Sequence, residues 1–226
     1  MARFKRFDVL RAVIESGLVP VFHHEDLDVA KRIAEALAGG GAKVLEFTNR
    51  GDSAYRTFSD LLKWCRGKTP DLILGVGSVI DPGTAALYIN DGANFVVGPV
   101  LNPEVARVCN RRKVAYMPGC GSASEVSLAE EYGAEICKVF PGQEVGGPQF
   151  VKNLLGPMPW SLIMPTGGVD RTRASIEKWF GAGVACVGMG SNLISKDLVA
   201  AGDFEAISRN TAELLQWIKE CRKPGR

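Results

Sequence analysis

Lys138 interrupts a run of apolar, strand-like residues, Ile136–Pro141. In an apolar interior an ammonium group loses its hydration, which favours the neutral amine. A neutral amine is a nucleophile toward ketones and can form a Schiff base with them. The alternative is a lysine at the end of a strand, whose ammonium reaches solvent or pairs with a carboxylate. The residue type and its setting therefore make covalent amine catalysis one of two interpretations.

Glu46 interrupts a second apolar run, Val44–Thr48. Because side chains alternate along a strand, Glu46 shares a face with Val44 and Thr48. A carboxylate in that setting needs a partner or has a raised pKa. Lys138 would be a suitable neighbour that holds Glu46 ionised, and Glu46 could then shuttle protons while an imine forms and hydrolyses. A structural salt bridge inside the fold is the alternative.

Polar and glycine-rich segments after other apolar runs could bind an anionic substrate. Arg50 could hold a carboxylate through two parallel hydrogen bonds. Glycines at 167, 168, 188 and 190 would let backbone amides approach a phosphate, helped by the dipole of a following helix. Ser78 and Pro99 follow the third and fourth apolar runs and could line a small keto-acid pocket, although tight turns explain these two positions equally well.

The chain offers little for metal or cofactor chemistry. His23 and His24 are adjacent, so they would not readily share one ion, and no carboxylate cluster or cysteine motif completes a site. The sequence also lacks a nucleophile elbow and a Ser-His-Asp arrangement. We therefore expect no metal and no cofactor.

Composition sets the broad class of the protein. The chain has 226 residues, 46% of them hydrophobic and 23% charged, with a net charge of +2. No basic run suggests a nucleic-acid partner, and no apolar stretch approaches the roughly 20 residues that a membrane span requires. Six scattered cysteines form no Cys-x-x-Cys pair, which is typical of a reduced, cytoplasmic protein.

Short apolar runs alternate with amphipathic segments along the whole chain. Repeated strand-helix units in a chain this short predict an α/β fold, a (β/α)8 TIM barrel forming one domain over residues 1–226. An extra helix at 6–16 would cover the bottom of the barrel. An open doubly wound sheet is the alternative. The runs lie at 18–22, 44–47, 72–74, 95–97, 114–117, 136–140, 162–164 and 184–187.

Amphipathic segments between these runs predict helices at 28–37, 53–65, 103–112, 124–132, 173–180 and 204–221. Gly-Ala pairs begin at Gly41, Gly92, Gly133 and Gly181, each between a helix and the next strand. Glycine there would end the helix and turn the chain.

Four segments, 44–50, 75–79, 138–141 and 165–169, occur together in an order and spacing that resemble one family. The chain resembles the 2-keto-3-deoxy-6-phosphogluconate (KDPG) and 4-hydroxy-2-oxoglutarate (KHG) aldolases, a class I family, over about residues 10–193. The resemblance implies a TIM barrel that needs no cofactor and assembles as a homotrimer. It implies that Lys138 forms the Schiff base and that Glu46 is the general acid and base. Implied substrate contacts are Arg50, Ser78, Pro99 and Thr166, with Phe140 beside them, for the pyruvate portion, and Gly167, Gly168 and Ser191 for the phosphate.

The activity that the resemblance implies is cleavage of KDPG to pyruvate and glyceraldehyde 3-phosphate, and also of KHG to pyruvate and glyoxylate. Several loops depart from the commonest family pattern, including His23-His24, 97–100, 118–122 and 141–148. These departures concern the identity of the aldehyde more than the chemistry. Two other functions remain open: a phosphosugar isomerase or epimerase that uses Glu46 as its base, and a non-catalytic barrel that binds keto acids.

Overall fold

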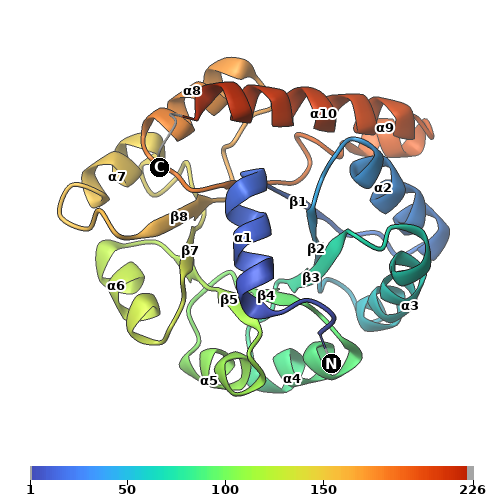
Figure 1. Cartoon of the computed structure of the whole chain (residues 1–226), viewed down its shortest axis with the longest axis horizontal. Coiled ribbons are helices and arrows are strands. Elements are labelled where there is room, and N and C mark those ends of the chain that lie inside the picture. Colours follow the sequence, from blue (N-terminus) through green and yellow to red (C-terminus); the bar gives the residue numbers. More distant parts are fainter. Residues whose placement is uncertain (1, 223–226) are drawn as a thin grey trace.

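Parallel strands surrounded by helices form a closed barrel in the computed structural model, which describes residues 2–222 (Figure 1). The (β/α)8 architecture is therefore confirmed, and the open sheet is excluded. The strands are β1 (Leu18–Phe22), β2 (Val44–Thr48), β3 (Ile73–Gly77), β4 (Phe95–Val97), β5 (Ala115–Met117), β6 (Gly119–Cys120), β7 (Ile136–Val139), β8 (Leu162–Pro165) and β9 (Val187–Met189).

The barrel consists of two arcs of hydrogen-bonded strands, β5-β4-β3-β2-β1-β9 and β6-β7-β8. The segments β5 and β6 are successive parts of one barrel strand, interrupted at Pro118, which has no amide hydrogen to donate. Its carbonyl still accepts a hydrogen bond from the Lys138 amide, at 2.9 Å. The other seam closes where Thr166 pairs with Gly188 in a parallel bridge.

Helices pack around the outside of the barrel, and side-chain caps fix where many of them begin. Asp26, Asp81, Asn102, Ser122 and Thr172 each accept a hydrogen bond from a backbone N–H in the first turn of the helix that follows. The outer helices are α2 (Leu27–Gly39), α3 (Ala54–Lys68), α4 (Pro82–Asp91), α5 (Pro103–Arg112), α6 (Ala123–Glu131), α7 (Gly147–Leu154), α8 (Arg173–Gly181), α9 (Lys196–Ala200) and α10 (Phe204–Cys221).

Helix α1 (Arg6–Ser16) lies across the N-terminal end of the barrel, over its centre in Figure 1. Its buried residues Val9, Leu10 and Val13 pack on the apolar side chains that point into this half of the barrel. The helix therefore covers the bottom of the barrel, as the sequence predicts. The interior side chains are Val19, Val44, Ile73, Phe95, Val97, Ala115, Met117, Ile136, Met164 and Cys186.

The C-terminal end of α10 is tied to both α1 and the strand that closes the barrel. The guanidinium of Arg222 donates hydrogen bonds to the carbonyls of Ile14 and Glu15, at the end of α1. It also donates to the carbonyl of Ala185, just before β9, at 2.9 Å. These bonds join the first helix of the fold to the last.

Two details near the eighth strand differ from the prediction. The strand covers Val187–Met189 instead of 184–187. The expected turn at Gly181 is also wrong, because α8 continues through Gly181 and the left-handed residue is Gly183, with φ of 101°. The other three positions, Gly41, Gly92 and Gly133, do have positive φ angles.

Among residues 2–222, no helix combines the length and the apolar composition needed to cross a bilayer.

Candidate active site

The residues predicted to carry chemistry all come from one end of the barrel. Glu46 is the middle residue of β2 and Lys138 is the third of four residues in β7, and each lies two residues beyond a member of the apolar interior layer, Val44 and Ile136. The loops after parallel strands meet at the same end of a barrel, where catalytic sites of this fold are found. The remaining predicted residues end or follow a strand: Arg50, Ser78, Pro99, Phe140, Thr166, Gly167, Gly168 and Ser191.

Lys138 is a buried lysine that faces the barrel interior. It alternates with Ile136, which belongs to the interior apolar layer, and only 5% of its surface is exposed. In the sheet it is paired with Gly119 on one side and Met164 on the other. Its Nζ lies 4.9 Å from the centre of the Phe140 ring, close enough for a cation–π interaction. The structure thus places an amine among apolar and aromatic groups.

Glu46 is a buried carboxyl group on the same interior surface as Val44. Only 1% of it is exposed, and its Oε2 has no hydrogen-bond partner within the described residues. Burial raises the pKa of Glu46, while the positive charges of Lys138 and Arg50 oppose that rise. Because burial is the larger effect, the carboxyl holds its proton to a higher pH than an exposed glutamate does.

Lys138 and Glu46 do not form the structural salt bridge that was the alternative explanation for their burial. Within residues 2–222, no salt bridge of 4.0 Å or less joins them. They come from β2 and β7, which belong to different arcs of the barrel. The positive charge of Lys138 does act on Glu46 in the expected direction, but it does not prevail over burial. A structural salt bridge therefore does not explain why these two residues are buried here.

Glycines on neighbouring strands leave the interior positions free for Glu46 and Thr166. A Cβ atom at Gly77 would lie 1.8 Å from Oε1 of Glu46, and one at Gly188 would lie 2.2 Å from Oγ1 of Thr166. Such contacts are far inside van der Waals distance, so neither side chain could keep its place. Sequence reasoning missed this role, although glycine inside an apolar strand is a known sign of close approach.

The loop that carries Arg50 is held by hydrogen bonds on both sides. The Asn49 amide donates to the Gly77 carbonyl, and the Tyr88 hydroxyl donates to Oδ1 of Asn49, both at 2.8 Å. Arg50 itself is exposed, and its charge reaches Glu46. Ser78 follows β3 with φ of 60°, a left-handed conformation that is unusual for serine. The loop after β2 therefore places the positive charge of Arg50 where it acts on the buried carboxyl of Glu46.

The glycine-rich loop after β8 packs against the loop after β7. Gly167 and Gly168 have φ of 89° and 73°, and a Cβ atom at Gly168 would lie 2.2 Å from Cβ of Gln143. The Gln143 amide donates to the Gly167 carbonyl at 3.2 Å, and the Gly142 amide donates to the Thr166 carbonyl at 2.9 Å. These contacts explain why the loop needs glycine.

The expected helix dipole at the glycine loops is not found. After Gly190, the amides of Leu193 and Ile194 both donate to its carbonyl, which gives a single turn, and α9 begins only at Lys196. Similarly, α8 begins after its cap at Thr172 instead of at Gly168. Within the described residues, the amide of Ser191 has no backbone acceptor. Free amides, not a helix terminus, are what this region offers to an anion.

His23 lies beside this region at the end of β1. Its Nδ1 donates a hydrogen bond to the Thr48 carbonyl at 3.2 Å, and its ring lies 5.5 Å from that of Phe47. No group of three or more His, Cys, Asp or Glu side chains in residues 2–222 has the arrangement of a metal site.

Comparison with known proteins gives one consistent family. The family model for KDPG and KHG aldolase matches residues 9–210. A 2-dehydro-3-deoxy-phosphogluconate aldolase of Pseudomonas aeruginosa is 36% identical over 212 residues, covering 92% of each chain. A KHG/KDPG aldolase of Escherichia coli K12 is 30% identical over 210 residues, covering 92% of this chain and 95% of its own.

A solved structure agrees with these relatives. The KDPG aldolase of Legionella pneumophila, with pyruvate captured as a covalent carbinolamine, superposes with a TM-score of 0.81 at 28% identity. The match covers 90% of this chain and 96% of that one. From the family model, the relatives and the shared fold, we conclude that the chain belongs to the KDPG and KHG aldolase family.

Proposed function

We propose that this protein is a class I aldolase that cleaves KDPG to pyruvate and glyceraldehyde 3-phosphate through a Schiff base on Lys138. The same chemistry extends to cleavage of KHG to pyruvate and glyoxylate. The observation that carries the proposal is the burial of one amine and one carboxyl in the barrel interior, 5% and 1% exposed, without a salt bridge between them.

The proposed reaction begins when the neutral amine of Lys138 attacks the C2 ketone of the substrate. Glu46, whose pKa burial raises, gives a proton to the departing hydroxyl, and water leaves as the iminium forms. The iminium accepts the electron pair of the C3–C4 bond as the C4 hydroxyl gives its proton to the Glu46 carboxylate, and the aldehyde departs. The enamine that remains is protonated at C3, and hydrolysis releases pyruvate and the free amine.

The remaining predicted residues would position the substrate. Arg50 and Thr166 would hold the carboxylate beside Ser78 and Pro99, while the ring of Phe140 packs against the reacting carbons. The amides of Gly167, Gly168 and Ser191 would bind the phosphate. Orientation of this kind contributes to the rate by holding the ketone within reach of the amine.

The decisive test is to trap the Schiff base. Treatment with pyruvate and borohydride should attach one reduced pyruvate to the chain, and peptide mapping should place it on Lys138. The variant Lys138→Met should give no adduct and lose at least about 1,000-fold in kcat/KM for KDPG, since the covalent route is lost. Lys68→Met, which removes an exposed lysine of α3, serves as the control.

If Lys138→Met kept full cleavage activity, the proposal would be wrong. Turnover of a phosphosugar without any trapped adduct would instead indicate an isomerase or epimerase that uses Glu46 as its base. Binding of pyruvate without turnover of any substrate would indicate a non-catalytic keto-acid-binding barrel.

We further propose that residues 1–226 form one domain and that the protein is a cytoplasmic homotrimer. Two exposed apolar side chains suit a subunit contact: Ile80 is 58% exposed and Val100 is 54% exposed. Hydrogen bonds hold both loops in place. The Asn102 side chain donates to the Ile80 carbonyl. The Tyr116 hydroxyl donates to the Val100 carbonyl. Light scattering with size-exclusion chromatography would measure the mass, and a monomer or dimer would exclude the trimer.

A further inference from the structure

A cavity of about 620 Å³ lies on the N-terminal face of the barrel, at the opposite end from the candidate active site. Its volume falls within the range of small-molecule sites, roughly 300–1,000 Å³. The walls come from the segment before α1, the beginning of α1, and the turns that lead into β5 and β7. The lining residues include Arg3, Phe4, Lys5, Arg6, Phe7 and Lys113. The aldolase reaction proposed above uses none of them.

The wall formed by the N-terminal segment is held in place by a buried side chain. Asn94 is only 2% exposed, and its Oδ1 accepts hydrogen bonds from the amides of Arg3 and Phe4, at 3.0 and 3.1 Å. Its Nδ2 donates to the Leu74 carbonyl at 2.8 Å. The segment is therefore anchored to the barrel, so this side of the cavity is formed in advance of any ligand.

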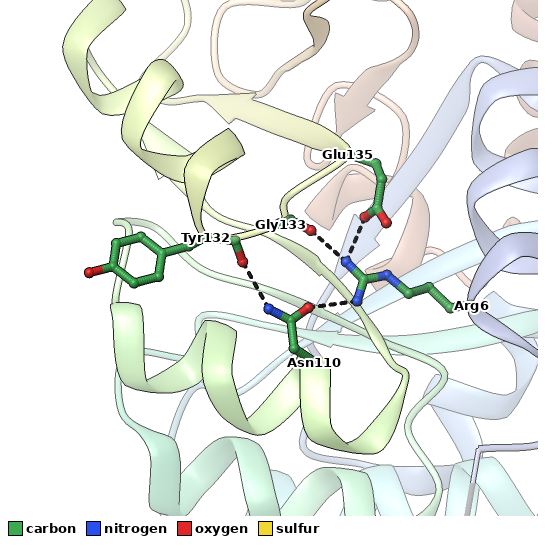
Figure 2. A network of polar contacts seen from close by, with 5 residues as sticks. All are labelled: Arg6, Asn110, Tyr132, Gly133 and Glu135. Carbon is green, nitrogen blue, oxygen red and sulfur yellow. Dashed lines mark hydrogen bonds and ion pairs between the residues drawn. The ribbon is translucent and has the colours of Figure 1, made fainter.

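A second network fixes the opposite wall, as Figure 2 shows. The Arg6 guanidinium donates to Oδ1 of Asn110 at 2.7 Å, to the Gly133 carbonyl, and to Oε2 of Glu135 at 2.8 Å. Asn110 in turn donates through Nδ2 to the Tyr132 carbonyl at 2.9 Å. Arg6 thus neutralises Glu135, the carboxylate in the lining, while its own buried Nε has no partner within the described residues.

Positive charge remains in excess around the cavity. Within the described part of the chain, Arg3, Lys5 and Lys113 form no salt bridge with any carboxylate. Arg112 donates to Oδ1 of Asn90, a neutral group. The lining therefore concentrates cations in a chain whose net charge is only +2. Such a concentration attracts anions.

The position of Lys113 adds an independent indication. Lys113 ends α5 in a left-handed conformation, with φ of 54°, where glycine is the usual residue. A residue with a Cβ atom is strained there, and strained residues gather at ligand sites. Lys113 thus places a cation at the edge of the cavity, at a position whose backbone conformation favours glycine.

Apolar side chains complete the cavity and define the body of its ligand. Phe4, Ile89 and Val114 line it, and Phe7 contributes a ring that is 76% exposed. We propose that this cavity binds an amphipathic organic anion, with a flat apolar body of one or two rings that carries a sulfonate, carboxylate or phosphate group. The rings would lie against the phenylalanines, and the anionic group would face Arg3, Lys5 and Lys113.

The test uses the aromatic sulfonate 8-anilinonaphthalene-1-sulfonate, whose fluorescence rises on binding, and N-phenyl-1-naphthylamine, which has the same rings without the charge. We expect the sulfonate to bind at one site and the neutral compound to bind at least about tenfold more weakly, since the cations act only on the anion. The double variant Lys5→Gln/Lys113→Gly should weaken sulfonate binding by about tenfold.

The matched control is Arg209→Gln, which removes an exposed cation of α10, far from the cavity, and should leave binding unchanged. Glycine at position 113 suits the local φ, and Lys5→Gln alone provides a second variant if thermal unfolding shows the double variant to be misfolded.

The result does not depend on the proposed aldolase activity. Saturating pyruvate and the variant Lys138→Met should both leave sulfonate binding unchanged, whether or not the protein cleaves KDPG. Displacement of the sulfonate by pyruvate would place it in the catalytic end of the barrel and overturn the proposal. Equal affinity for the neutral compound, or full affinity in a folded Lys5→Gln/Lys113→Gly variant, would also overturn it.

Discussion

At the scale of single residues, Glu46 shows how burial and nearby charge compete for one proton. Lys138 and Arg50 favour the ionised carboxylate, but burial favours the neutral acid more strongly, so the pKa rises. A neutral carboxylic acid can donate a proton to a departing hydroxyl, which an ionised one cannot. The same opposition of charge and burial makes Glu46 a source of pH-dependent stability.

The variant Glu46→Gln should be more stable than the natural protein at alkaline pH and equally stable at acidic pH. The pKa of Glu46 is higher in the folded protein than its ordinary value near 4.5, so protonation of Glu46 favours the folded state. This contribution to stability is fully present below pH 4.5 and is lost as the pH rises through the folded-state pKa. Urea unfolding at several pH values would measure the difference. Glu35→Gln, an exposed glutamate of α2, controls for the loss of one charge. A difference that shrinks with rising pH would contradict the assignment.

At the scale of secondary structure, the sequence predicts most elements because their signals are local. The run that contains Lys138 and the run that contains Glu46 are short, apolar and bounded by turns, so both strands could be identified. Caps such as Asp26 and Asn102 define where helices begin. The interruption at Pro118 could not be predicted in the same way, because whether a proline breaks a strand depends on the pairing of its neighbours.

The candidate site was predictable in its members but not in its geometry. The alternation of side chains along each strand predicts that Lys138 and Glu46 point into the barrel. The distance between the amine and the carboxyl depends on where the two strands lie in the barrel, which the sequence does not reveal. The sequence predicted that Lys138 holds Glu46 ionised, whereas in the fold burial outweighs the charge of Lys138. The roles of Gly77 and Gly188 are likewise invisible along the chain, because each makes room for a residue on another strand.

Replacing Gly77 with alanine should therefore impair catalysis through Glu46. The new Cβ atom would lie 1.8 Å from Oε1 of Glu46, so the carboxyl must move, and kcat/KM should fall by about 100-fold. Steady-state cleavage of KDPG would measure the effect. The control is Gly67→Ala in α3, where a Cβ atom meets nothing within 4 Å. This substitution should stabilise the helix by about 0.5–1 kcal/mol, because alanine favours helices more than glycine does. Natural activity in a folded Gly77→Ala variant would disprove the role given to this glycine.

At the scale of the whole molecule, the barrel has a packed end and a reactive end. Helix α1 closes the first with Val9, Leu10 and Val13, and the buried Lys138 and Glu46 lie toward the second. Apolar packing at one end stabilises a fold whose other end contains buried polar groups, which are costly. The division predicts that the buried face of α1 contributes mainly to stability.

Leu10→Ala should lower the free energy of unfolding by about 2–5 kcal/mol, because it leaves a cavity under α1. Phe7→Ala in the same helix should change it by less than about 0.5 kcal/mol, since Phe7 is 76% exposed whereas Leu10 is 6% exposed. Chemical denaturation would measure both. Equal losses in the two variants would show that α1 does not close the barrel as described.

The closure of the barrel also bears on how the chain is made. Strand β1 pairs with β9 through Leu18 and Val187, and Arg222 holds the end of α10 to α1. A ribosome delivers β1 long before β9, so the growing chain carries an open strand edge for most of its translation. Open edges invite pairing with other chains. Emergence of β9, which pairs with β1, is therefore the event that covers this edge.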